Sequence, residues 1–372
     1  MRHIESIDGW YLRVPLATPY HLSKVMGTLT HSDAIIIRVT LDDGTAGWGE
    51  SDPGGVAFDG VTGESVFTAV HERSHGMLGI DVSEWVQEHQ GRGGKGALDA
   101  AFDVACFDAL ARAEHKPVWQ LLGKQQTDRI DVLWPTSSGS AADDMEIIRL
   151  RYAEGFRTYM LKMGDRPAAD DLERLRAVLT VVPKDVRIMV DANQGWSREE
   201  AIAFARGARD LPIILIEQPV DREDLVGLKQ VRDIGCTVSV DESLQHPDDV
   251  KRIVHAHAAD VFSVKISKNG GLANSVWIAM EAVHNKKRVL MNSMIELGIT
   301  QAASLHLGCT LTNLVNCGHA YMSTLRMSDD ITDFSDWISG GVAVLPDRPG
   351  LGVEVDEGKI AKYQAGAFHV EQ

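Results

Sequence analysis

Residues 187–193, RIMVDAN, form a short apolar run that ends in polar residues, and this pattern returns along most of the chain. Amphipathic stretches with the three- and four-residue spacing of a helix separate the runs. The other runs are RIDVLWP at 129–135, RTYMLKM at 157–163, ILIEQP at 214–219, TVSVDES at 237–243, VFSVKIS at 261–267 and RVLMNS at 288–293, with a weaker eighth near LVNCG at 314–318. The chain therefore repeats a strand-and-helix unit of nearly constant length.

Apolar strands that alternate with helices are typical of a parallel sheet covered by helices. About eight such units close into a TIM-like barrel of roughly 250 residues. We therefore predict an α/β fold with a (β/α) barrel over residues 126–327. A doubly wound open sheet is the alternative, but it would carry a glycine fingerprint at an early βα turn, and the sequence has none.

The first 125 residues show a different pattern. Residues 33–50, DAIIIRVTLDDGTAGWGE, place β-branched residues on both sides of an Asp-Asp-Gly turn, which predicts an antiparallel hairpin. Residues 97–121 carry apolar side chains at helical spacing, and residues 340–357 resemble short strands separated by turns. We predict an α+β capping domain over residues 1–125, completed by residues 328–372.

Composition narrows the class of protein. The 372 residues are 44% hydrophobic and 24% charged, which is ordinary for a globular protein with more than one core. A net charge of −16 disfavours a surface for nucleic acid or anionic membranes. Glu5 and Asp8 interrupt the place where a signal peptide needs its apolar core, so we expect a cytoplasmic protein without a membrane segment. We expect a small-molecule enzyme that forms a homo-oligomer.

Charged residues stand at the ends of five successive runs: Lys162, Asp191, Glu217, Asp241 and Lys265. The carboxyl ends of parallel barrel strands converge on one mouth, so these side chains should meet in space. Three carboxylates without His or Cys favour a hard cation with open coordination positions, and Mg²⁺ fits best. Without a cation or raised pKa values the carboxylates would repel one another. The sequence therefore predicts a Mg²⁺ site formed by Asp191, Glu217 and Asp241.

The two lysines have two interpretations. Lys162 and Lys265 could simply form ion pairs with the carboxylates, because structural networks often mimic active sites. Alternatively each is a general acid or base, with its pKa lowered toward working pH by a divalent cation and by the second ammonium group. A strong base beside a divalent metal suits abstraction of the proton α to a carboxylate, because the metal neutralises the enediolate charge as it develops.

Five motifs with these residues resemble one family. They are MLKMG around Lys162, VDANQGW at Asp191, IEQP at Glu217, VDES at Asp241 and VKISKNGG at Lys265. Together they resemble the barrel of the enolase superfamily, muconate lactonizing enzyme subgroup. GTAGWGES at 44–51, the stretch from 97 to 124 and GLGVEVDEG at 350–358 resemble the capping domain of that family. The resemblance implies the same three Mg²⁺ ligands and the same two acid/base lysines.

The resemblance also marks departures and further candidates. The family usually has Lys-x-Lys on the second strand, where this chain has Met160 before Lys162. The mandelate racemase branch would carry a His after the seventh strand, where this chain has Asn292 and Ser293, which disfavours that branch. Asn193 and Glu242 are expected behind the metal ligands. Glu296 is either a carboxylate in the cavity or a helix-start carboxylate.

Two glycine-containing loops of the cap, at 18–31 and 51–60, are suited to closing over the barrel mouth. In these loops Tyr20, His21, Met26 and Phe58 are candidates to contact substrate, and each could equally be ordinary loop packing.

The reaction type depends on the number of bases. Racemisation or epimerisation needs a proton acceptor on each face of a planar enediolate, and Lys162 and Lys265 can supply both. We therefore expect an isomerase, a racemase or epimerase acting on a carboxylate derived from an amino acid or imino acid. A cycloisomerase or a dehydratase of a hydroxy acid or hydroxyproline-like substrate is the alternative. A non-catalytic barrel that binds a metabolite is the alternative of another class.

Overall fold

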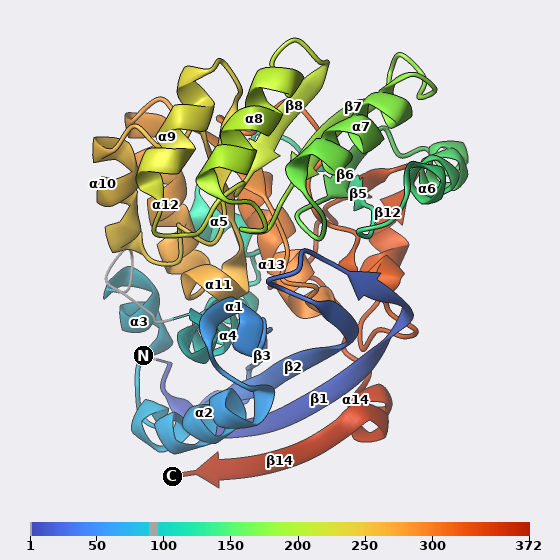
Figure 1. Cartoon of the computed structure of the whole chain (residues 1–372). Coiled ribbons are helices and arrows are strands. Elements are labelled where there is room, and N and C mark those ends of the chain that lie inside the picture. Colours follow the sequence, from blue (N-terminus) through green and yellow to red (C-terminus); the bar gives the residue numbers. More distant parts are fainter. Residues whose placement is uncertain (1, 89–95) are drawn as a thin grey trace.

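The structure is a computed structural model that describes residues 2–88 and 96–372. Its larger part is a curved, seven-stranded parallel sheet in the order β11-β10-β9-β8-β7-β6-β5, with helices around the outside (Figure 1). The strands are β5 (Leu133–Pro135), β6 (Thr158–Lys162), β7 (Arg187–Asp191), β8 (Ile213–Glu217), β9 (Val238–Val240), β10 (Val261–Val264) and β11 (Arg288–Met291). The predicted α/β barrel architecture is confirmed.

An irregular segment, residues 314–319, joins the two edges of this sheet. Leu314 forms a parallel bridge with Val289 of β11, and His319 forms one with Val132 beside β5. The segment changes partner within six residues, so it is too short on either side to form a regular strand. The weak eighth apolar run of the sequence corresponds to this closing segment.

The first predicted run, residues 129–135, is not one strand. Its first half is β4 (Arg129–Asp131), which pairs antiparallel with β13 (Val342–Val344). β12 (Ile338–Ser339) completes this small sheet. At Val132 the backbone N–H donates to the carbonyl of Gly341 (2.8 Å), so the tail of the chain holds the run apart from the barrel until β5 begins. The prediction of a single barrel strand was wrong for this first half.

Helices follow the barrel strands and pack on their outer side (Figure 1). They are α6 (Ala141–Ala153), α7 (Ala168–Leu179), α8 (Arg198–Ala208), α9 (Leu225–Asp233), α10 (Pro247–His255), α11 (Ile266–Asn269), α12 (Leu272–His284) and α13 (Gly298–Gly308). Ser140, Ser197 and Asp224 accept hydrogen bonds from the first turns of α6, α8 and α9, which fixes where these helices begin. In the described residues no helix is long and apolar enough to span a bilayer.

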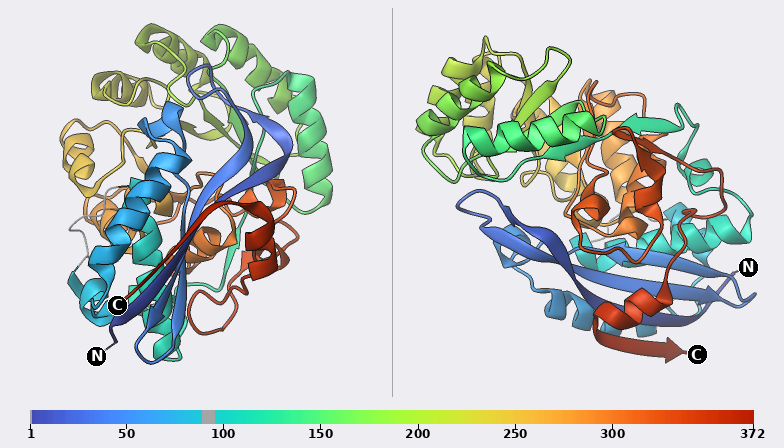
Figure 2. Two further views of the ribbon diagram at one scale, coloured as in Figure 1. Left: turned by 90° about the horizontal axis from the view of Figure 1, so that it is seen from below. Right: turned by 90° about the vertical axis from the view of Figure 1, so that its right-hand side faces the viewer.

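The capping domain is built on an antiparallel sheet in the order β14-β1-β2-β3. Its strands are β1 (Ile4–His21), β2 (Thr28–Leu41), β3 (Ala46–Ser51) and β14 (Gln364–Glu371). Because β14 pairs with β1, the two chain ends lie side by side (Figure 2). The helices of the described chain that have not yet been named are α1 (Val56–Asp59), α2 (Gly63–Met77), α3 (Val82–Glu88), α4 (Gly96–Ala113), α5 (Trp119–Leu122), η1 (Ser323–Arg326), η2 (Phe334–Trp337) and α14 (Glu357–Tyr363). The predicted hairpin at 33–50 is confirmed as β2 and β3, while the exact domain bounds stay a prediction.

Two glycines allow β3 to pack directly on α4. A Cβ atom on Gly49 would lie 1.9 Å from the carbonyl oxygen of Ala101, and one on Gly47 would lie 2.4 Å from that of Ala105. Any other residue would push the strand away from the helix.

Glu50, on the same strand, links the cap to the barrel. Its buried carboxylate accepts hydrogen bonds from the backbone N–H groups of Leu297 (2.6 Å) and Thr300 (2.7 Å) at the start of α13. A cap residue therefore satisfies the free N–H groups of a barrel helix.

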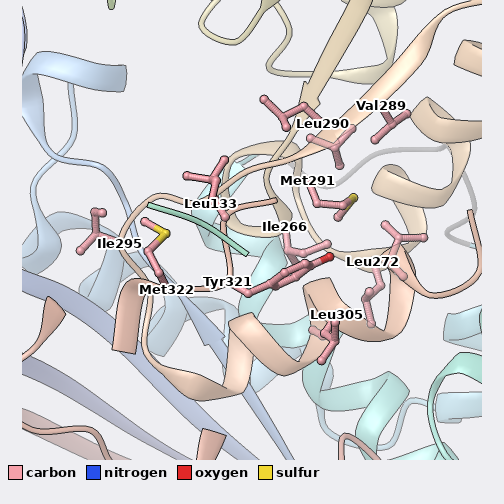
Figure 3. Close-up of a cluster of buried hydrophobic side chains, with 14 of the residues drawn as sticks. Leu133, Ile266, Leu272, Val289, Leu290, Met291, Ile295, Leu305, Tyr321 and Met322 are labelled. Atoms are coloured by element: carbon pink, nitrogen blue, oxygen red, sulfur yellow. The ribbon is translucent and has the colours of Figure 1, made fainter. Parts of the chain in front are cut away.

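A buried cluster lies where the chain leaves the closing segment. Figure 3 shows the ring of Tyr321 among side chains from β11, α12 and α13, including Met291, Leu272 and Leu305. Tyr321 is fully buried, and its hydroxyl donates to the carbonyl of Ser304 in α13 (3.3 Å). This contact anchors the end of the barrel against α13.

His319 ties the closing segment to β11. Its Nδ1 accepts the N–H of Met291 (3.0 Å), and its Nε2 donates to the carbonyl of Val315 (3.2 Å). This arrangement requires the neutral ring, because a protonated Nδ1 would face another N–H group. Burial lowers the pKa of His319 to about 4.

This low pKa makes the barrel sensitive to acid. The folded-state pKa lies below the unfolded value of about 6.5, so the stabilisation is complete above pH 6.5 and is lost as the pH falls toward 4. We expect His319 to account for a fall on the order of 3 kcal/mol in unfolding free energy over this window. In His319→Gln, urea unfolding should show lower stability at pH 7 but a shallower loss toward pH 4. His255→Gln, at an exposed position, is the control. An unchanged slope in His319→Gln would contradict the assignment.

Candidate active site

The ends of the central barrel strands bring the five predicted strand-end residues together. Lys162 is the register partner of Asp191 on β7, and Asp191 is the partner of Glu217 on β8. Asp241 and Lys265 directly follow the next two strands, β9 and β10. All five are buried. The structure thus gathers three carboxylates and two ammonium groups at one end of the barrel.

Each predicted lysine forms an ion pair with a different carboxylate. Lys162 Nζ donates to Asp191 Oδ2 at 2.5 Å, and Lys265 Nζ donates to Asp241 Oδ2 at 2.7 Å. Both lysines also line a single cavity at the barrel mouth. The ion-pair interpretation therefore describes part of the geometry, and the acid/base interpretation stays open because both ammonium groups face the cavity.

A third ammonium group, that of Lys268, was missed by the sequence reasoning. Its Nζ donates to Asp241 Oδ1 (2.8 Å) and to the backbone carbonyls of Asp241 (2.9 Å) and Ser263 (2.9 Å). Lys268 lies one helical turn after Lys265 in the motif VKISKNGG, and this spacing is the signal that could have revealed it.

The buried charges shift one another's pKa values. Burial raises the pKa of Glu217 well above its usual value, and repulsion from Asp191 and Asp241 adds to the shift. Burial lowers the pKa of Lys162, but the charges of Asp191 and of other acidic groups outweigh it and raise the pKa overall. The same balance raises the pKa of Lys265. From the sequence we expected lowered pKa values for Lys162 and Lys265. Such lowering requires a divalent cation that binds these carboxylates in place of the two ammonium groups.

The donor set of Asp191, Glu217 and Asp241 consists of hard oxygen atoms, which fits Mg²⁺. Asn292 Nδ2 donates to Glu217 Oε1 (2.8 Å), and Ser239 Oγ donates to Glu217 Oε2 (3.3 Å), so the hydrogen-bond donors that the described residues give Glu217 are neutral. Within residues 2–88 and 96–372, no three His, Cys, Asp or Glu side chains are already spaced around a metal position. The carboxylates fit the cation by chemistry, and ammonium groups now provide the positive charge for two of them.

Asn193 and Glu242 lie next to two of these carboxylates, Asp191 and Asp241. Asn193 Nδ2 donates to Glu242 Oε1 (3.2 Å), and the backbone N–H of Asn193 donates to Asp191 Oδ1 (2.8 Å). Burial raises the pKa of Glu242 to about 8, with repulsion from Asp241 and Asp191 adding to it. Asn193 Oδ1 and Glu242 Oε2 are buried, and neither has a hydrogen-bond partner among the described residues. The pair therefore keeps unused acceptors beside the carboxylates.

Glu296 is buried beside the end of β11. It accepts hydrogen bonds from Ser293 Oγ (2.5 Å) and Gln301 Nε2 (3.3 Å). Burial raises the pKa of its carboxyl. Glu296 does not line the cavity, and the N–H groups of Leu297 and Thr300 at the start of α13 donate to Glu50 instead.

A cavity of about 110 Å³ lies between the cap and the barrel mouth. Lys162, Lys265 and Asn193 line it from the barrel, and Tyr20, Met26 and Phe58 line it from the two cap loops. His21 does not: it is exposed, with its Nδ1 2.8 Å from Thr28 Oγ1. It stands at the end of β1, opposite Thr28.

The tip of the β1–β2 hairpin is fixed to loops of the barrel (Figure 2). Ser23 Oγ donates to the carbonyl of Asn193 (2.9 Å), and the N–H of Lys24 donates to that of Gly164 (3.3 Å). On the other side, the N–H of Ser138 donates to the carbonyl of His21 (2.8 Å). The hairpin therefore covers the mouth of the barrel on the side of β5 to β7.

Comparison with known families decides what this architecture is. Residues 10–123 match the mandelate racemase / muconate lactonizing enzyme N-terminal domain. Residues 144–359, more than half of the chain, match the enolase C-terminal domain-like family. The chain belongs to the enolase superfamily.

Within the enolase superfamily its similar proteins are isomerases of the muconate lactonizing enzyme type. Muconate cycloisomerase 1-2 of Acinetobacter lwoffii is 31% identical over 365 residues, covering 96% of this chain and 94% of that protein. L-Ala-D/L-Glu epimerase of Bacillus subtilis is 30% identical over 358 residues, covering 93% and 95%. The solved muconate lactonizing enzyme of Pseudomonas fluorescens, complexed with muconolactone, has a TM-score of 0.90 and 26% identity, covering 98% and 99%. The chain is an enzyme, and it belongs with these isomerases.

Two departures from the superfamily pattern have visible consequences. Met160, in place of the usual first lysine, is buried and lines the cavity, so it contributes an apolar surface there. Asn292, at the place of the histidine of the mandelate racemase branch, donates to Glu217 and lines the cavity with a neutral amide. Neither departure adds a basic side chain to the barrel wall of the cavity, which carries Lys162 and Lys265.

The contacts of Lys268 predict a stabilising role. Lys268→Met would leave Asp241 with one ammonium partner and would remove a buried donor from the backbone carbonyls of Asp241 and Ser263. Breaking a buried charge pair in this way costs about 3–5 kcal/mol, so urea unfolding should show a loss of this size. The control, Lys229→Met, breaks an exposed ion pair with Asp233 and should change stability by less than about 1 kcal/mol. Equal effects of the two substitutions would show that Lys268 does not compensate Asp241.

Proposed function

We propose that this enzyme is a Mg²⁺-dependent racemase or epimerase that moves the α-proton of a small carboxylate derived from an amino acid. The observation that carries the proposal is the pair of lysines. Lys162, from β6, and Lys265, after β10, lie on strands separated by three others, and both line one cavity, each paired with a different carboxylate. A similar protein named for epimerase activity on L-Ala-D/L-Glu supports it.

Asp191, Glu217 and Asp241 would hold the Mg²⁺ ion, and enzymes of this family generally depend on this cation. When bound, it would neutralise the negative charge that develops on the substrate carboxylate. It would also supply the positive charge that the lysines now provide to Asp191 and Asp241. This exchange of partners matters because a lysine that is held as an ammonium ion cannot accept a proton.

The lysines would share the proton transfer. The neutral amine of one lysine accepts the α-proton from one face of the substrate, which leaves an enediolate. The ammonium group of the other lysine donates a proton to the same carbon from the opposite face, and the configuration is inverted. In the reverse direction the two lysines exchange roles. Asn193, beside Asp191 and facing the cavity, would help to orient the substrate.

Cycloisomerisation is the second candidate, because muconate cycloisomerase 1-2 of Acinetobacter lwoffii is also similar. It needs only one of the two lysines as acid or base. A dehydratase would likewise use one lysine as base. The alternative of a non-catalytic binding barrel loses its support, because the similar proteins are enzymes.

A proton-exchange screen tests the proposal. The protein with Mg²⁺ in D₂O is incubated with dipeptides that include L-Ala-L-Glu, N-acyl amino acids, hydroxy acids and muconate. We expect α-deuterium incorporation and loss of optical purity with at least one amino-acid derivative. Conversion of muconate without any α-proton exchange on amino-acid derivatives would favour the cycloisomerase instead. No reaction across the panel would contradict both.

The effect of removing the cation, or one of its ligands, on thermal stability and on Mg²⁺ affinity can be measured without a substrate. We expect Mg²⁺ to raise the melting temperature and EDTA to reverse this change. Asp191→Asn should lose about 10-fold or more in Mg²⁺ affinity by calorimetry, because a neutral amide replaces a carboxylate. Asp210→Asn, which changes a carboxylate that is 87% exposed, is the matched control. Full turnover in EDTA would contradict the role of Mg²⁺.

Single lysine variants distinguish a two-base from a one-base reaction. Lys162→Ala and Lys265→Ala should each reduce racemisation by about 1,000-fold or more. Each variant should still exchange the α-proton of the one enantiomer that its remaining lysine faces. Lys251→Ala, an exposed position on α10, should behave as wild type. A variant of either cavity lysine that keeps near-normal turnover would exclude the two-base mechanism.

A further inference from the structure

The cavity carries an uneven charge distribution. From the barrel, its charged lining residues in the described chain are the two lysines, which already face Asp191 and Asp241. From the cap, its ionisable lining residues are His31, Asp33 and Asp52. The cap end of the cavity therefore holds both of the acidic residues that line it.

Two of these cap residues are compensated by neighbours. Arg13 Nε lies 3.3 Å from Asp33 Oδ1, and Arg13 Nη2 lies 2.5 Å from His31 Nε2. Tyr11 also donates its hydroxyl to Asp33 (2.6 Å). This group is partly exposed and balanced in charge, so it leaves little field inside the cavity.

Asp52 is different because no basic side chain pairs with it in the described chain. It is 6% exposed, and it accepts hydrogen bonds from the N–H of Gly54 (2.7 Å) and from Ser32 Oγ (3.3 Å). Burial raises the pKa of its carboxyl well above the usual value, and the nearby carboxylate of Glu296 adds to the shift. Such a group is stabilised in its charged form when a cation approaches it.

The backbone of Asp52 is held in place by the barrel. Its N–H donates to Ser267 Oγ (3.0 Å), two residues after Lys265. This fixed position relates the Asp52 carboxylate to the acid/base end of the cavity. Between the two ends the walls are largely apolar and adaptable, with Met26, Met160, Met294 and Met322 among them.

We infer that the cavity selects a carboxylate whose far end is a cation on an apolar stem, and that Asp52 is the residue that accepts this cation and rejects a second carboxylate. The inference rests on the proposed function, which places the reacting carboxylate at the lysine end. A second carboxylate would lie among methionines and face Asp52 without a positive partner, which costs free energy through desolvation, and repulsion adds to this cost when Asp52 is ionised. A dicarboxylate such as muconate is therefore a poor fit.

Three side chains with one stem test this inference. Lysine, 2-aminoheptanoate and 2-aminopimelate share a stem of four methylene groups that ends in an ammonium, a methyl or a carboxylate group. Each is offered as the N-acetyl derivative and as the L-alanyl dipeptide, and kcat/KM for α-proton exchange is measured with Mg²⁺ in D₂O. We expect the lysine compounds to exceed the 2-aminopimelate compounds by about 100-fold, with 2-aminoheptanoate between them.

The variant Asp52→Asn assigns the preference to this carboxylate. The amide keeps an oxygen for the N–H of Gly54, and we expect the lysine to 2-aminopimelate ratio to fall by at least about 10-fold. Asp43→Asn, which removes one charge at the exposed β2–β3 turn, should leave the ratio as in wild type. A melting curve and exchange on the 2-aminoheptanoate compounds show whether each variant is folded.

The possible outcomes separate this inference from the proposed function. A wild-type ratio near one, a preference for 2-aminopimelate, or a ratio unchanged by Asp52→Asn would overturn the inference. Exchange elsewhere in the wider panel but on none of these six compounds would also overturn it, while the proposed function would stand. No exchange on any compound would contradict the proposed function and this inference together.

Discussion

Repulsion between three buried carboxylates is the constraint on which this structure depends. Asp191, Glu217 and Asp241 stand at the ends of neighbouring parallel strands, where the barrel brings them close together in a poorly solvated place. The protein offsets this repulsion with ammonium groups from the flanking strands β6 and β10, and with Lys268. Two of these three lysines, Lys162 and Lys265, are also the groups to which the proposed function assigns proton transfer. In that proposal the site exchanges ion-pair partners before it reacts.

Two segments outside the regular barrel strands help to form the barrel mouth. The segment at 314–319 closes the sheet by two bridges and by the ring of His319, and a regular eighth strand is not needed to complete the mouth. On the other side of the mouth, the β1–β2 hairpin is fixed to loops that follow barrel strands, through Ser23 and Lys24. The cavity thus has one wall from each domain, and its shape depends on how the two domains dock.

Sequence reasoning predicted the features that periodicity determines, and it failed where contacts come from distant parts of the chain. The repeat length and the polar ends of the runs placed Lys162 and Asp191 correctly side by side, because parallel strands share a register. The division of 129–135 depends on pairing with a tail more than 200 residues away. The role of Lys268 depends on the orientation of the short helix α11, and that of Glu50 on the position of α13. No local pattern contains this information.

The stretch from Gly47 to Asp52 shows how the inferred substrate selection by Asp52 would be coupled to domain docking. Successive side chains of a strand point to opposite faces, so Gly47 and Gly49 admit the backbone of α4 while Glu50 reaches α13. Directly after the strand, Asp52 enters the cavity and its N–H is held by the barrel. A substitution of Asp52 that changes specificity must therefore preserve the packing of β3 on α4, the contact of Glu50 with α13 and the hydrogen bond from the N–H of Asp52 to the barrel. The same rigidity gives a single carboxylate a fixed position relative to the lysines, and a fixed charge discriminates between ligands more sharply than a mobile one, which can move away from an unfavourable partner.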